Sequence, residues 1–131
     1  MSEPDHNTPF SLMARFQSLR HALQGINTLL GEQHNARIHL VIALAVVTAG
    51  FVLQIDRGEW LIIVLLIGWV LSMEAFNSAL EYLCDLVNRD EHPLIGKAKD
   101  VAAAAVLFSA LSAAVIGLLI FLPRLWTLFL H

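Results

Sequence analysis

Charged residues and cysteines are scarce in this chain, and their scarcity excludes several classes of protein. Only 15% of the 131 residues are charged, whereas 57% are hydrophobic; an ordinary soluble domain has about 25% charged residues. The single cysteine, Cys84, cannot form a disulfide within the chain, so the fold is not a disulfide-stabilised scaffold. A net charge of −3 is too small to indicate a nucleic-acid-binding surface. The composition instead indicates an integral membrane protein.

Long apolar runs predict an all-α membrane protein, a single domain over residues 1–131. The predicted transmembrane helices are 38–55, 60–85 and 101–122. The middle run is uncharged only from Trp60 to Met73, which is about 21 Å of helix against a hydrocarbon core of about 30 Å. That crossing must therefore continue past Glu74. Glu74 is then expected away from the bilayer centre, on the side of the membrane where the middle span ends.

The N-terminal part of the chain is polar and then amphipathic. Residues 1–8 are expected to be disordered. Thr8 and Pro9 suit the N-cap and first position of a helix over 9–31. Apolar residues recur there at steps of three and four, which suits a helix lying in the membrane interface. Packing of the same stripe against the bundle would give the same pattern.

Basic residues set the expected orientation, because they favour the cytoplasmic side. Six of the eight lie before the first span or between the second and third spans, which places the N-terminus and the 86–100 loop in the cytoplasm. Pro93 and Gly96 are expected to break regular structure in that loop. Pro123 is expected to end the third span.

A polar face interrupts the middle span between Met73 and Asp85. At about 100° per residue, its four polar side chains share an arc of about 80° on one side of a helix. They are Glu74, Asn77, Glu81 and Asp85. Acidic groups at membrane depth are costly and usually functional. A helix that has left the membrane and shows a solvated side would give the same pattern.

A second polar stretch enters the first span. Glu32 and Gln33 are expected at the same membrane depth as Glu81. Snorkelling and capping are sufficient to explain Arg37 and His39.

Three segments together resemble one family, the small prokaryotic diacylglycerol kinases and undecaprenol kinases. Met-Glu-Ala-Phe-Asn-Ser-Ala-Leu-Glu at 73–81 resembles its Glu-x-x-Asn-(Ser/Thr)-Ala-(Ile/Leu)-Glu signature. The stretch 92–106 is similar to its His…Ala-Lys-Asp motif, and 35–39 to the entry of its first span. The resemblance covers roughly residues 19–124.

The resemblance implies a homotrimer of three-span subunits that transfers phosphate from ATP, with Mg²⁺, to a membrane lipid alcohol. By motif, Glu74 matches the catalytic base at the lipid, Glu81 a metal ligand and Asn77 a support for the same site. The remaining matches are to nucleotide-binding positions: Lys99 and Asp100 as a pair, and Asp90, Glu91 and His92 in a loop.

One position departs from the family pattern. Gln33 stands where the family often has a glutamate that serves as the second metal ligand, with Glu32 one place earlier. Either Gln33 binds more weakly through its carbonyl oxygen, or Glu32 takes over, or water fills the place. Ala103, where diacylglycerol-specific members tend to have serine, and the 35–39 segment favour undecaprenol as the lipid.

A function from another class fits the same carboxylates. Glu74 and Glu81 of an oligomer would also suit a proton or cation path through a non-enzymatic membrane protein. Lys99 favours the kinase, because a cation path has no use for a lysine at its mouth, whereas a phosphate site does.

Overall fold

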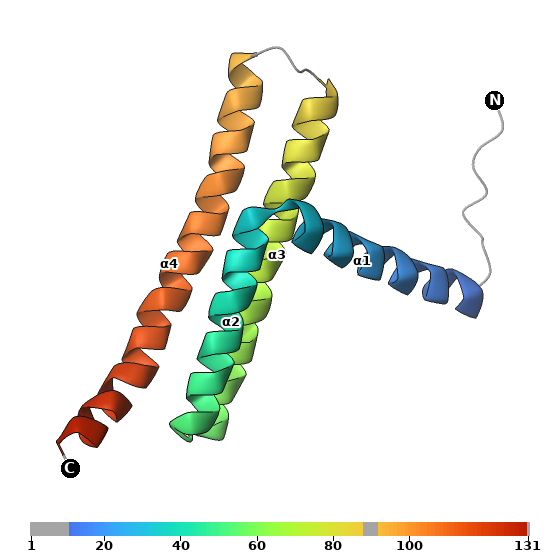
Figure 1. Cartoon of the computed structure of the whole chain (residues 1–131). Helices are drawn as coiled ribbons and strands as arrows, with labels where there is room; N and C mark the ends of the chain where they lie inside the picture. Colours follow the sequence, from blue (N-terminus) through green and yellow to red (C-terminus); the bar gives the residue numbers. More distant parts are fainter. Residues whose placement is uncertain (1–10, 88–91, 131) are drawn as a thin grey trace, which may run out of the picture.

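The computed structural model describes residues 11–87 and 92–130, which form a helical bundle with one projecting helix (Figure 1). The helices are α1 (Leu12–Glu32), α2 (His34–Val52), α3 (Arg57–Val87) and α4 (Pro93–Phe129). The last three are each long and apolar enough to cross a membrane. Helix α3 lies beside both α2 and α4, and runs antiparallel to them. The predicted all-α membrane fold is confirmed.

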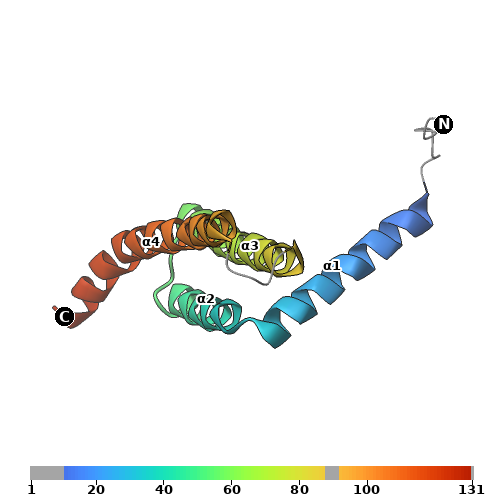
Figure 2. The same ribbon diagram turned by 90° about the horizontal axis from the view of Figure 1, so that it is seen from above.

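Helix α1 points away from the bundle in both views (Figures 1 and 2). It begins at Leu12 with Ser11 as N-cap, whose hydroxyl accepts a hydrogen bond from the Ala14 N–H at 3.3 Å. The predicted start at Thr8 and Pro9 lies outside the described residues. No residue of α1 is buried. The apolar stripe therefore does not pack on the bundle of its own chain, and it is free to lie in a membrane interface.

Small residues bring α2 close to α3. Ala36, Ala43 and Gly50 recur every seven residues on α2 and are all buried. Gly50 lies against Trp60 of α3, and Ala43 lines the same cavity as Ile63 and Val70 of α3. Without large side chains at these α2 positions the two backbones approach closely, which is how helices associate where lipid removes the hydrophobic drive.

Helix α4 is longer at both ends than the predicted span. Pro93 is its first residue rather than a breaker, because the missing N–H of proline costs nothing there. His92 is the N-cap, and its Nδ1 accepts a hydrogen bond from the Leu94 N–H at 3.3 Å. The second half of the predicted 86–100 loop is therefore helix. Pro123 does not end the helix, which bends near this residue and continues to Phe129 (Figure 1).

A polar cluster joins the helices at the end of the bundle where α2 turns into α3. Asp56 and Glu59 form a reciprocal capping box, in which each carboxylate accepts the backbone N–H of the other, at 3.0 and 2.8 Å. The hydrogen bond from the Glu59 N–H lowers the pKa of Asp56. Arg124, one residue past the proline, donates to Glu59 and to the Gln54 carbonyl. The start of α3 and the end of α4 are thus joined at the turn after α2.

We expect Gly50→Ala to lower the melting temperature of the purified protein. The added methyl would lie 2.8 Å from Cη2 of Trp60 and 3.0 Å from Cδ1 of Ile55. Overpacking of this kind costs about 1–3 kcal/mol, which exceeds the gain of up to about 1 kcal/mol from replacing a helical glycine. Gly25→Ala is the control, because a methyl there meets nothing within 4 Å. An equal or higher melting temperature for Gly50→Ala would contradict the packing described.

Candidate functional site

The predicted polar face lies on the second half of α3, and its first carboxylate is the most buried. Glu74 is only 1% exposed. Asn77 is also buried, and its Nδ2 donates a hydrogen bond to Oε1 of Glu81 at 3.2 Å. The Ser78 hydroxyl donates to the backbone carbonyl of Glu74 at 2.9 Å, so it does not serve the carboxylate. One uninterrupted helix therefore carries the whole row, from the middle of α3 towards its C-terminal end.

The carboxylate of Glu74 faces one polar group from another helix. Nε2 of His39, on α2, lies 3.8 Å from Oε2 of Glu74. Oε2 is buried and has no hydrogen-bond partner within residues 11–87 and 92–130. A distance of 3.8 Å is within ion-pair range but longer than a hydrogen bond. An acidic oxygen left in this state is costly, which marks a functional group rather than a stabilising one.

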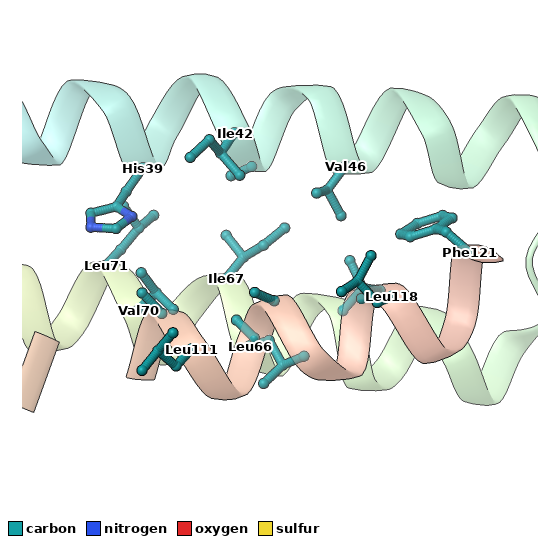
Figure 3. A pocket seen from close by; sticks show the side chains of 16 residues that line it. His39, Ile42, Val46, Leu66, Ile67, Val70, Leu71, Leu111, Leu118 and Phe121 are labelled. Carbon is teal, nitrogen blue, oxygen red and sulfur yellow. The ribbon is translucent and has the colours of Figure 1, made fainter. Parts of the chain in front are cut away.

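An apolar cavity of about 620 Å³ opens between α2, α3 and α4, next to this pair. Figure 3 shows His39 at one end of the cavity and Phe121 at the other, with the side chains of the three helices pointing into it. Ala113 and Gly117, two small residues one turn apart on α4, form part of the wall. Apart from His39, the lining side chains are apolar.

Tyr82 connects the α1–α2 corner to α3. Its hydroxyl donates to Oε2 of Glu32 at 2.8 Å and accepts from Nε2 of Gln33 at 3.4 Å. Because Tyr82 directly follows Glu81, Glu32 and Gln33 lie at the level of Glu81 along the bundle, while their common depth in a membrane stays a prediction.

The predicted nucleotide-binding side chains lie on α4, opposite the end of α3. Nζ of Lys99 is 2.7 Å from Oδ1 of Asp85. Asp100 is exposed on the next position of the same helix. Since α4 begins at Pro93, both residues lie nearly two turns inside the helix rather than at its start. The other two loop positions, Asp90 and Glu91, lie outside the described residues.

Two residues that the sequence interpretation passed over belong to this region. His39 was assigned to snorkelling, but its ring faces Glu74. Capping is the correct explanation for Arg37, whose guanidinium donates to the Gly31 carbonyl at 3.0 Å. Tyr82 gave one available signal, since it is the only tyrosine and adjoins the signature glutamate.

The carboxylates of the polar row form no metal-ligand cluster among the described residues. Within the described ranges no three His, Cys, Asp or Glu side chains come close enough to hold an ion. Oxygen donors of the kind that Mg²⁺ prefers are nevertheless present at the level of Glu81. Oδ1 of Asn77 is buried without a hydrogen-bond partner in the described part of the chain, while the amide nitrogen is turned to Glu81.

Comparison with known proteins identifies the family of the chain. The model of the family described as prokaryotic diacylglycerol kinase matches residues 20–121. The chain is 41% identical to the undecaprenol kinase of Bacillus subtilis over 125 residues, which are 95% of this chain and all of that protein. It is 37% identical to the diacylglycerol kinase of Synechocystis over 112 residues, 85% of this chain and 64% of that protein. The chain therefore belongs to the prokaryotic diacylglycerol kinase family, and it is an integral membrane lipid kinase.

Proposed function

We propose that this kinase transfers the γ-phosphate of ATP to the hydroxyl of a membrane lipid alcohol, with Glu74 as the base. The observation that carries the proposal is the burial of the Glu74 carboxylate beneath a lysine that suits phosphate. Kinase membership disfavours the cation-path alternative. It also gives the carboxylate row a chemical use.

The helix geometry divides the site by depth. Tyr82 marks the level at which α1 leaves the bundle, and hence the membrane surface if α1 lies in the interface. Glu74 lies eight residues deeper on α3, about 12 Å below that level. Asp85 and its partner Lys99 lie on the other side of it, where α3 and α4 extend beyond α2 (Figure 1). A lipid hydroxyl and a water-soluble nucleotide could thus reach adjoining parts of one site.

The reaction requires removal of the lipid hydroxyl proton and stabilisation of the negative charge on the transferred phosphate. As the lipid oxygen bonds to the γ-phosphorus, the bond from that phosphorus to the β–γ bridging oxygen of ATP breaks, ADP leaves with that oxygen, and the hydroxyl proton passes to Glu74. Phosphoryl transfer otherwise asks mainly for positioning and charge neutralisation. Lys99 suits the second task, because its ammonium has three N–H donors and can contact a phosphate as well as Asp85.

Mg²⁺ fits the oxygen donors around Glu81, about two helical turns from Glu74 along α3. Glu81 would hold it with the carbonyl oxygen of Asn77, and either Glu32 or Gln33 would add a further oxygen. The bound ion would neutralise the charge of the β- and γ-phosphates. The hydrogen bond from Tyr82 engages Glu32 in the structure, whereas Gln33 uses its amide nitrogen and keeps its carbonyl oxygen for other partners. We favour Gln33 as the weaker second ligand. Asp100 and the loop residues Asp90, Glu91 and His92 complete the proposed nucleotide contacts.

Undecaprenol is the favoured acceptor, with diacylglycerol as the alternative. The similarity to an undecaprenol kinase over its full length supports this choice, as does Ala103. The proposed working form is a homotrimer in the bacterial cytoplasmic membrane, with the N-terminus in the cytoplasm. Exposed large apolar residues along all three spans are compatible with contacts to lipid and to neighbouring subunits.

Glu74→Gln is expected to lower kcat by about 10²–10⁴-fold, the usual contribution of a general base, without weakening ATP binding. The amide keeps the size of the side chain but accepts no proton. Turnover of undecaprenol with radiolabelled ATP measures the first effect, and ATP titration of the purified protein the second. Full lipid phosphorylation by this variant would remove Glu74 from the base role.

Lys99→Met is expected to raise the KM for ATP by about tenfold or more, because a hydrogen bond to a charged group contributes about 1.5–3 kcal/mol. The KM for the lipid should not change. Lys97→Met, two residues earlier on the same helix, is the matched control. Equal effects of the two variants would indicate a general loss of positive charge instead of a specific contact.

The acceptor is decided by competition between two lipids. Undecaprenol and diacylglycerol are offered together in equal amounts in detergent micelles with labelled ATP, and the chloroform-soluble products are separated. We expect the label chiefly in undecaprenyl phosphate. Label chiefly in phosphatidic acid would assign the chain to the other branch of its family.

A further inference from the structure

We propose that His39 is the positioning residue for Glu74, holding one carboxylate oxygen so that the other faces the lipid hydroxyl. The inference rests on the proposed role of Glu74 as base. It adds a residue of α2 to a site whose other proposed members lie on α3, α4 and the α1–α2 corner.

The first argument is the state of the Glu74 carboxylate. A carboxylate has two oxygens, each able to accept hydrogen bonds, and a buried oxygen without a partner carries an uncompensated cost. Oε2 is such an oxygen in the described part of the chain. The hydroxyl of Ser78, one turn along, is already bonded to a backbone carbonyl. His39 therefore presents the one polar side chain that ion-pairs with Glu74 among the described residues.

The second argument is the placement of the imidazole. His39 lies on α2, a separate helix, so its position relative to Glu74 depends on how the two helices pack. Buried Ala36 and Ala43, one turn to either side of it, set the close spacing of α2 and α3. Nε2 is 3.8 Å from Oε2, within ion-pair range, and a closer approach of these two atoms would give a hydrogen bond. An N–H donated from a second helix would fix the carboxylate plane.

The third argument is the cavity. His39 is the sole polar member of its lining, at the end next to the carboxylate (Figure 3). A histidine placed there only for packing would serve no better than leucine, because every neighbour in the wall is apolar. Its polarity is explained by Glu74, since a donor within an apolar wall controls where the charged oxygen points.

The test compares His39→Leu with His39→Gln. Leucine fills the space without a donor, whereas the amide nitrogen of glutamine can occupy nearly the place of Nε2. We expect His39→Leu to lower kcat by about 10- to 100-fold, the size of effect that a misplaced catalytic group produces. The KM for ATP should stay within about twofold, and His39→Gln should recover most of the lost kcat. Thr48→Val, an exposed polar-to-apolar change on the same helix, is the control for altered polarity of α2.

The outcomes separate this inference from the assignment of Glu74. Wild-type kcat in His39→Leu, with Glu74→Gln inactive, would overturn the role of His39 and leave the base in place. Full activity of Glu74→Gln would overturn both. A loss that is equal in His39→Leu and His39→Gln, or that raises the KM for ATP in proportion, would also overturn the positioning role, because a structural defect explains it.

Discussion

The cost of placing a carboxylate inside an apolar bundle is the constraint on which this structure depends. Glu74 is almost fully buried, and the described residues leave one of its oxygens without a hydrogen bond. Such a group destabilises the fold, so its retention needs a function or a compensating partner. The chain supplies a partner only at ion-pair distance, across the α2–α3 contact. The packing contact between α2 and α3 is therefore as much a part of the candidate site as the Glu74 carboxylate.

The unequal lengths of the helices set how far the polar groups of α3 and α4 lie from the α1–α2 corner. Helix α2 has 19 residues, whereas α3 and α4 have 31 and 37. The two longer helices extend past the point where α1 leaves, and they carry the Lys99–Asp85 pair with them (Figure 1). Under the proposed function, an apolar substrate and a polar co-substrate approach from different media, and this difference in helix length would serve both.

The sequence predicts the helices well and their contacts only in part. Apolar runs and the position of Glu74 were enough for the spans, because period and length decide them. Helix α4 exceeds the predicted span at both ends, because a first-turn proline such as Pro93 is favourable and a membrane helix tolerates a bend at Pro123. The pairing of His39 with Glu74 could not be predicted from periodicity, which gives the face of each helix but not the register between two helices.

Arg124, which bonds to the turn between α2 and α3, also bears on how the protein is made. The α2–α3 hairpin, with its capping box of Asp56 and Glu59, is synthesised before α4. Arg124 emerges from the ribosome only after more than sixty further residues, counted from Glu59. Its bonds to that turn can form only once α4 has entered the membrane. The bonds that join the three spans at this end thus form late in biogenesis, and a nascent chain that stops short of Arg124 would carry the α3 carboxylates without these bonds.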